Sequence, residues 1–159
     1  MPTIDSNQPF TEENINNNML RIILWDAMGQ ERHRVITKSF FKRSNIVIFV
    51  YDITRRETFS ELNYWINTSS QILEKEEVIF GIAANKSDLF FKNEVNKEEG
   101  EEYANNINGL FSETSAKQNL NGFKIFVKEL LEKLISNPKI FEKIEQKNEN
   151  GSNFYLDIL

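Results

Sequence analysis

Cysteine is absent from this 159-residue chain, and glycine and proline are scarce, with six and three residues. Without cysteine we expect no disulfide, no thiolate metal site, no cysteine nucleophile and no thioether lipid anchor. Long apolar runs are also missing, since the longest two, residues 46–51 and 78–84, are far too short to span a bilayer. The first residues lack the pattern of a signal peptide, so we expect a cytoplasmic protein.

Positive charge is in deficit, with 19 Lys and Arg against 24 Asp and Glu, a net charge of −5. Nucleic-acid binding relies on basic surface to release counterions, so no nucleic-acid partner is expected. Apolar residues make up 40% of the chain, which is enough to build the core of one ordinary domain.

Four segments are predicted to be strands. Residues 19–25 alternate, with Leu20, Ile22 and Leu24 on one side, and residues around Thr11 are a weaker candidate for a hairpin partner. The continuous apolar runs 46–51 and 78–84 are typical of strands covered on both faces, as in a parallel sheet. Residues 110–113 form a shorter fourth candidate.

Helical periodicity falls between these strands, in residues 59–73, more weakly in 95–107 and strongly in 123–134. The last helix is expected to stop at Asn137-Pro138. Alternating strands and helices predict an α/β fold with a mainly parallel sheet. Residues 139–153 are mostly polar and are expected to be mobile. The apolar residues 154–159 are expected to be a frayed terminus, with docking on the body or on a partner as the alternative.

Three motifs follow predicted strands. They are Asp26-Ala27-Met28-Gly29-Gln30-Glu31, Asn85-Lys86-Ser87-Asp88 and Thr114-Ser115-Ala116-Lys117. Each motif alone is a weak signal, but the three in this order, each at a strand end, form a specific pattern. In an open α/β sheet, ligands bind beyond the carboxyl ends of the strands.

The second and third motifs suit a guanine base. A carboxylate at Asp88 can accept hydrogen bonds from the ring N–H and the exocyclic amine of guanine, a pair that adenine lacks. Asn85 can tie the two loops together and reach the base edge. The aliphatic stems of Lys86 and Lys117 can cover the two faces of the base. The Ala116 N–H can donate to the guanine carbonyl oxygen.

The first motif suits the phosphate end of the same nucleotide. Asp26 is placed to hold Mg²⁺ through water. Gly29 lets its backbone N–H approach the terminal phosphate, and Gln30 could orient the attacking water.

Each of these residues also has a plainer interpretation. Asp26 and Asp88 could be strand-end residues or helix caps, and Gln30 could be an ordinary surface residue. The acidic run of residues 98–102 is predicted to be a solvated helix face rather than a metal site. Arg55-Arg56 is predicted to be a turn after a strand.

Taken together, these motifs resemble those of Ras-superfamily small GTPases, most closely the Rab branch. Residues 25–32 resemble the family's WDTAGQER, residues 50–54 its VYDIT, residues 85–88 its NKSD and residues 113–117 its ETSAK. Pro2-Thr3-Ile4 resembles the end of the family's first switch. The resemblance implies a P-loop NTPase-like fold and a GTP-hydrolysing molecular switch in vesicle-mediated transport. It places Gln30 in catalysis and Ser115 among the nucleotide-binding residues.

The resemblance also implies cofactors and partners. GTP or GDP would be bound with Mg²⁺, held by Thr3 and Asp26. Effectors, exchange factors and GTPase-activating proteins would contact residues 1–8 and 26–40. Without a cysteine for a lipid anchor, the protein would reach endomembranes only through such partners.

The family's phosphate loop, G-x-x-x-x-G-K-[ST], is not found, because none of the six glycines is followed by lysine. By resemblance, residues 1–136 then form a small GTPase domain that lacks its first strand, phosphate loop and first helix. Residues 137–159 would form a C-terminal tail. We expect the chain to bind GTP weakly. A fragment of a working GTPase and a non-catalytic interaction module, or pseudoGTPase, are the two interpretations.

In the family, the missing strand lies between the strands that match residues 19–25 and 46–51. Its absence is expected to leave unpaired backbone groups on both neighbours, at roughly 1–3 kcal/mol for each buried group. The chain should therefore be unstable, dependent on a partner that supplies the strand, or rearranged.

Overall fold

The computed structural model describes residues 11–26, 41–42, 44–73, 77–147 and 154–158. Within these residues the strands are β1 (Thr11–Ile15), β2 (Asn18–Leu24), β3 (Ile46–Asp52), β4 (Ile79–Asn85), β5 (Leu110–Glu113) and β6 (Phe154–Ile158). The helices are α2 (Arg56–Ser60), α3 (Leu62–Ser70), the 3₁₀ helix η2 (Ser87–Lys92), α4 (Lys97–Asn106), α5 (Leu120–Ile135) and α6 (Pro138–Lys147). The predicted α/β class and its four main strands are confirmed, and so is the hairpin partner around Thr11.

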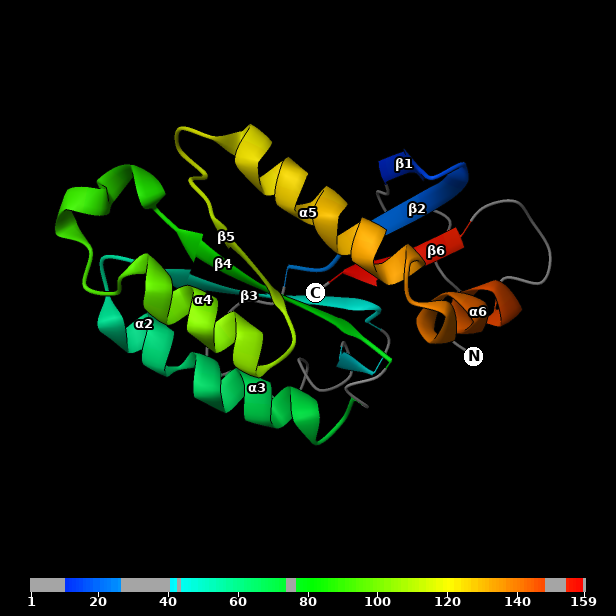
Figure 1. Ribbon diagram of the computed structural model, residues 1–159, viewed down its shortest axis with the longest axis horizontal. Helices are drawn as coiled ribbons and strands as arrows, with labels where there is room; N and C mark the ends of the chain where they lie inside the picture. The colour runs from blue at the N-terminus through cyan, green and yellow to red at the C-terminus, as the bar shows by residue number, and fades with distance from the viewer. Residues whose placement is uncertain (1–10, 27–40, 43, 74–76, 148–153, 159) are drawn as a thin grey trace.

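The six strands form one sheet in the order β1-β2-β6-β3-β4-β5 (Figure 1). β1 and β2 make an antiparallel hairpin through Asn16 and Asn17, both at positive φ, a conformation that asparagine tolerates well. The other pairings, β2 with β6, β6 with β3, β3 with β4 and β4 with β5, are all parallel. The predominantly parallel sheet agrees with the sequence prediction.

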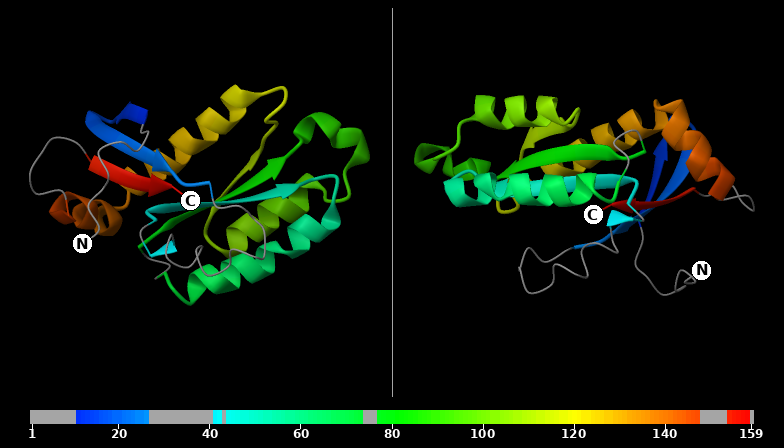
Figure 2. Two further views of the ribbon diagram at one scale, coloured as in Figure 1. Left: turned by 180° about the vertical axis from the view of Figure 1, so that it is seen from behind. Right: turned by 90° about the horizontal axis from the view of Figure 1, so that it is seen from below.

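The sheet separates two hydrophobic clusters, with α2, α3 and α4 on one face and α5 and α6 on the other (Figures 1 and 2). Side chains of β3 alternate between them: Ile46 packs with α5, whereas Val47 and Phe49 pack on the opposite face. This alternation explains why β3 is apolar at nearly every position. Gly81 of β4 lets α5 approach closely, because a Cβ there would lie 2.9 Å from Cζ of Phe126.

The C-terminal segment differs from its prediction. Residues 139–153 are expected to be mobile, but those up to 147 belong to α6, which buries Ile140 and Ile144 in the α5 cluster. The amphipathic spacing of these two residues is what gives the otherwise polar segment a packing face. Residues 154–158, expected to fray, form β6 between β2 and β3.

β6 also corrects the expected gap in the sheet. The position predicted to stand empty between β2 and β3 holds β6, so β2 is paired along Leu20–Leu24. Of the two neighbours, only β3 keeps a largely unpaired side among the described strands, since Ile46 alone pairs with β6. Of the three expected outcomes, rearrangement is the one that the structure shows.

Candidate functional site

The carboxyl ends of β4 and β5 bring two of the three sequence motifs together. Asn85 ends β4, and the segment from Thr114 follows β5. Backbone hydrogen bonds join the two segments: Thr114 N–H donates to the Ala84 carbonyl at 2.8 Å, and Ser87 N–H donates to the Thr114 carbonyl at 3.0 Å. The parallel pairing of β4 with β5 therefore continues into the loops and fixes both motifs at one edge of the sheet.

Ser115 connects Asp88 to the second loop. Its hydroxyl donates to Oδ1 of Asp88 at 2.5 Å and accepts from the Gln118 N–H at 3.0 Å. Ser115 is 2% exposed, so this hydrogen bond is sheltered from water. A carboxylate offers about four lone-pair sites, so Asp88 keeps acceptor capacity on both oxygens for a ligand with two parallel N–H donors.

Asn85 makes a second contact between the same two loops. Its Oδ1 accepts from the Ala116 N–H at 3.3 Å. The predicted role of Asn85 in tying the loops together fits this contact. The Ala116 N–H, which sequence analysis assigned to the guanine carbonyl, is engaged by Asn85 here, so that assignment stays a prediction.

Lys86 lies in the left-handed region, at φ 66° and ψ 33°, between Asn85 and η2. Its Nζ lies 2.5 Å from Oδ2 of Asp52 at the end of β3. Burial acts to raise the pKa of Asp52, but hydrogen bonds from Lys86 and Thr54 outweigh it and hold the pKa below its usual value. Asp52 therefore stays ionised and fixes the direction of the Lys86 stem. Lys117, the second predicted cover of the base, is exposed.

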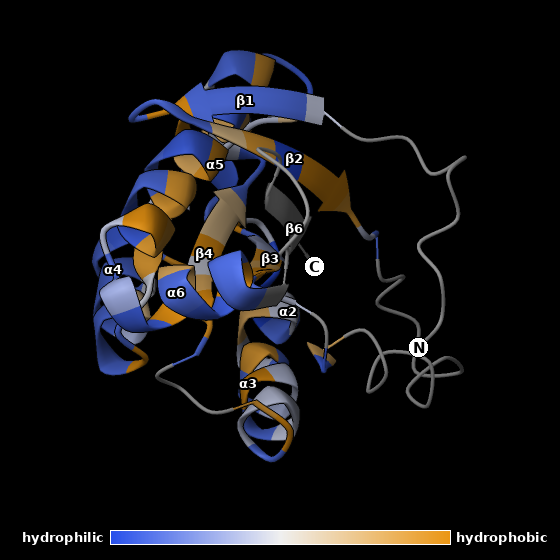
Figure 3. Ribbon diagram, turned by 90° about the vertical axis from the view of Figure 1, so that its right-hand side faces the viewer, coloured by the Kyte–Doolittle hydropathy of each residue, from blue (hydrophilic) through white to orange (hydrophobic). Residues whose placement is uncertain are grey.

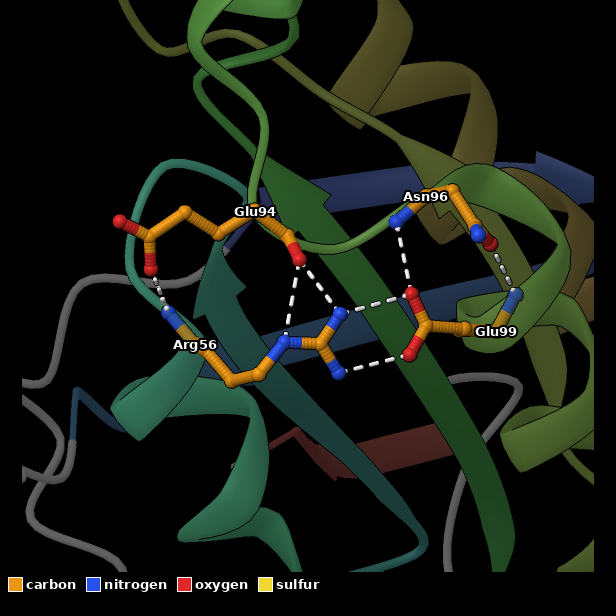
Figure 4. Close-up of polar contacts among 4 residues, drawn as sticks. All are labelled: Arg56, Glu94, Asn96 and Glu99. Carbon is orange, nitrogen blue, oxygen red and sulfur yellow. Dashed lines mark hydrogen bonds and ion pairs between the residues drawn. The ribbon is translucent and has the colours of Figure 1, made fainter.

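Arg56 makes a second set of polar contacts at the same edge of the sheet (Figure 4). Its guanidinium donates to both carboxylate oxygens of Glu99, at 2.7 and 2.9 Å, and to the Glu94 carbonyl. Its backbone N–H donates to Oε2 of Glu94 at 2.8 Å. These contacts join the segment after β3 to the start of α4. Sequence analysis missed them because Arg56 and Glu99 are 43 positions apart.

Asp26 is placed differently from the loops after β4 and β5. It is exposed and lies two residues beyond Leu24, which pairs with Ile158, and Ile158 pairs in turn with Ile46 at the start of β3. This register puts Asp26 four residues before the level of Asp52. At about 3.3 Å per residue, that is roughly 13 Å along the strand direction. The structure therefore assembles the second and third motifs but does not bring Asp26 level with them.

Several predicted residues lie outside the described part of the chain: Thr3, Gly29 and Gln30, together with the effector segments at 1–8 and 27–40. Among the described residues, no group of three or more Asp, Glu or His side chains could hold a metal ion by itself. Likewise, no helix in the described segments is long and apolar enough to cross a membrane. A cavity of about 660 Å³, lined by residues such as Ile79, Asn108 and Lys133, lies at the amino end of β4, away from this edge.

The fold defines a class: an α/β protein with a predominantly parallel sheet flanked by helices, whose loops after β4 and β5 are joined at one edge. A family model, that of the Ras family, matches residues 1–136. The chain belongs to the Ras family, and its α/β sheet flanked by helices is consistent with a P-loop NTPase-like small GTPase fold.

Guanine nucleotide and Mg²⁺, which this family generally binds, fit the described residues unequally. The guanine base fits, because Asp88 is fixed in place and keeps acceptor capacity. For Mg²⁺, only Asp26 of the two predicted ligands is described. A single carboxylate suits an ion held mainly by water and phosphate, and Mg²⁺ commonly keeps several waters.

Proposed function

We propose that this chain recognises guanine nucleotides through the loops after β4 and β5, as a Rab-like member of the Ras family. The observation that carries the proposal is the contact of Ser115 with Asp88, supported by that of Asn85 with Ala116. Because these contacts lie within the protein, the carboxylate that selects guanine is held in place before any ligand binds.

Each described residue has a chemical task in this proposal. Asp88 accepts from the two N–H donors of guanine, which adenine cannot supply. The ion pair with Asp52 directs the stem of Lys86, one of the two proposed covers of the base. Bound Mg²⁺ would neutralise charge on the phosphates, and Asp26 would orient it through water. In hydrolysis, Gln30 would orient the attacking water.

The cellular role that we propose is a GTP-dependent switch in vesicle-mediated transport, acting at endomembranes from the cytoplasm. It is supported by the resemblance of residues 25–32 and 50–54 to Rab sequences. Regulators and effectors would contact residues 1–8 and 26–40. The absence of a G-K-[ST] sequence predicts that this chain holds phosphates weakly, because no glycine-rich loop surrounds them. A non-catalytic module that keeps only base recognition is the alternative.

Competition binding tests the base-recognition role. GDP and ADP would be titrated against the purified chain in Mg²⁺. The proteins compared are the wild type, Asp88→Ala and a control, Glu98→Ala, which changes an exposed residue of α4. We expect GDP to bind more weakly than micromolar, yet at least tenfold more tightly than ADP, a difference of about 1.4 kcal/mol. Asp88→Ala should remove the preference, and Glu98→Ala should keep it.

Three outcomes separate the interpretations. Equal affinity for GDP and ADP in the wild type would contradict guanine recognition. Micromolar or tighter Mg²⁺-dependent binding of GTP would contradict the weak phosphate binding, and would favour a working switch over the non-catalytic module. Guanine selectivity without measurable hydrolysis would favour the module.

A further inference from the structure

β6 occupies an unusual place in the sheet. It is the last strand in the sequence, yet it lies between β2 and β3, parallel to both (Figure 1). The other five strands stand in the order in which they occur along the chain. Residues 154–158 therefore enter a position that the order of the remaining strands leaves open, which we call the central lane.

The two sides of the central lane hold β6 very unequally. On one side β6 is in register with β2 along its whole length, from the pair Leu20 and Phe154 to the pair Leu24 and Ile158. On the other side only Ile158 pairs, with Ile46. β3 is fully paired with β4 on its far side, from Ile46 to Asp52. The sheet is thus divided into the units β1-β2-β6 and β3-β4-β5, which meet at one residue pair of β6 and β3.

Burial falls along both strands towards their carboxyl ends. On β2, Leu20 is 0% exposed but Leu24 is 60% exposed, and on β3, Ile46 is 0% exposed but Val50 is 54% exposed. All four are at alternate positions of their strands, and Leu20 and Ile46 belong to the cluster under α5. The carboxyl end of β2, which is hydrophobic (Figure 3), and Val50 of β3 therefore each leave an apolar side chain exposed to solvent beside the central lane.

The connection to β6 leaves it separable from the rest of the fold. α6 contacts β6 and is itself held by Ile140 and Ile144 in the core under α5. Because α6 is held by its own core residues, its packing does not require the pairing of β6 with β2. Departure of β6 would break its strand pairing with β2 and its contacts with α6.

We propose that the central lane is an exchangeable strand-binding site whose occupant is this chain's own segment 154–158. β6 binds there by parallel addition to β2, as extended peptides add to the open edge of a sheet. Its departure exposes the edge of β2 that faces away from β1 and leaves the β3-β4-β5 unit intact. A segment of the same sequence and length, supplied in trans, can take its place.

Exchange of β6 has a consequence for the candidate site, and this consequence alone rests on the proposed function. Asp26 follows β2 directly, whereas the base-recognition loops follow β4 and β5. The position of Asp26 relative to the base therefore depends on what occupies the central lane. Loss of β6 should alter the phosphate end of the site and leave guanine selectivity unchanged.

A labelled peptide with the sequence of residues 152–159 tests the exchange directly on the full chain. The variant Tyr155→Pro/Leu156→Pro empties the lane, because successive N–H groups of a strand point to opposite edges and one of the two must face β2. The matched control, Tyr155→Thr/Leu156→Val, keeps both donors and favours a strand. We expect the peptide to bind the proline variant at least tenfold more tightly than the wild type or the control.

A scrambled peptide should bind none of these proteins. Equal affinity of the peptide for the wild type and the proline variant, or no binding to either, would overturn the proposal. The assay contains no nucleotide, so its outcome is independent of whether the chain recognises guanine.

Amide hydrogen exchange on the wild type gives a second test that needs no variant. If β6 leaves locally, residues 18–24 and 154–158 should exchange at least tenfold faster than residues 79–85 of β4. In the proline variant, the added peptide should restore protection to residues 18–24. Exchange of all three segments at one common rate in the wild type would show that β6 departs only on global unfolding, and would overturn the proposal.

Discussion

At the scale of single residues, Tyr51 is the clearest departure from ordinary packing. It is 2% exposed, and its hydroxyl has no hydrogen-bond partner within the described structure. Burial, followed by the charges of Glu113 and Glu99, raises the pKa of Tyr51 to about 12. The ring contacts Phe59 edge-on, with 4.9 Å between centroids, so its apolar part is well packed while its hydroxyl is not.

Tyr51→Phe should therefore leave the free energy of unfolding at pH 7 unchanged or raise it by about 1 kcal/mol, since a buried unsatisfied hydroxyl is removed. The folded protein holds this proton up to about pH 12, whereas an unfolded tyrosine loses it near pH 10. Stability of the wild type should thus fall between pH 10 and 12 more steeply than that of the variant. Urea unfolding at pH 7 and pH 11 measures both effects. A loss above 1 kcal/mol at pH 7 would mean that the hydroxyl has a stabilising partner.

Gly100 lies next to Tyr51 and sets how closely α4 approaches the sheet. A Cβ there would lie 2.4 Å from Cε2 of Phe111 and 2.6 Å from the Tyr51 hydroxyl. Glycine in a helix normally costs about 0.5–1 kcal/mol relative to alanine, so this close approach is the reason to keep it.

Gly100→Ala should accordingly destabilise the protein by about 1–3 kcal/mol, because the clash outweighs the gain in helix propensity. Asn105→Ala, at an exposed position of the same helix, is the matched control and should be neutral or stabilising. Thermal unfolding of the two variants and the wild type measures these changes in stability. A more stable Gly100→Ala would show that α4 can shift away from β5 at little cost.

At the scale of elements, the N-terminus of α4 depends on Glu99. The side chain of Asn96 accepts from the Glu99 N–H at 2.8 Å, and Glu99 accepts from the Asn96 N–H at 3.0 Å, which forms a capping box. Glu99 also binds Arg56 in a bidentate ion pair. The hydrogen bond from Arg56, followed by that from Asn96, lowers the pKa of Glu99 to about 2.

The pH dependence of stability should report on this arrangement. A carboxylate whose folded pKa lies below its unfolded value of about 4.5 stabilises the fold above that value. That stability is lost as the pH falls towards 2. The wild type should therefore lose more stability between pH 5 and pH 2 than Glu99→Gln, with Glu98→Gln as the control. Parallel curves for the wild type and Glu99→Gln would contradict the role of the ion pair in solution.

Sequence patterns predict some of the helices and strands of this fold but not others. β3 and β4 are predicted from the continuous apolar runs 46–51 and 78–84, because both faces of these strands are buried against helices. Residues 138–147 fall within the predicted C-terminal tail, 137–159, because Ile140, Phe141 and Ile144 are few apolar residues among many charges. The contact between Arg56 and Glu99 depends on the sheet bringing distant loops together, and no local pattern carries that information.

At the scale of the whole molecule, the arrangement of the sheet is what sequence analysis could not supply. The parallel class was predictable from strand composition, and so was the meeting of Asn85–Asp88 with Thr114–Lys117 at one edge. The entry of residues 154–158 between β2 and β3 was not, because strand order depends on long-range pairing rather than on local periodicity. The offset of Asp26 from the loops after β4 and β5 follows from that same pairing.

The packing of α6 makes a prediction at this scale. Ile140 is 2% exposed and lies in the core cluster of α5 and the sheet, so Ile140→Ala should lower the free energy of unfolding by about 2–5 kcal/mol. Glu142→Ala, on the exposed side of the same helix, should change it by less than about 0.5 kcal/mol. Denaturant unfolding compares the two. Equal, small effects would mean that residues 138–147 are not part of the cooperative unit.

A ¹H–¹⁵N spectrum of the full chain, titrated with GDP and separately with ADP, tests guanine recognition at the loops after β4 and β5 directly. GDP should shift the amide signals of Lys86, Asp88, Ala116 and Lys117, and ADP should leave them in place. The signals of α6, which lies at the far end of the molecule from these loops (Figure 1), should not move with either nucleotide. Absence of shifts at these loops with GDP, or the same shifts with ADP, would contradict guanine recognition at the carboxyl ends of β4 and β5.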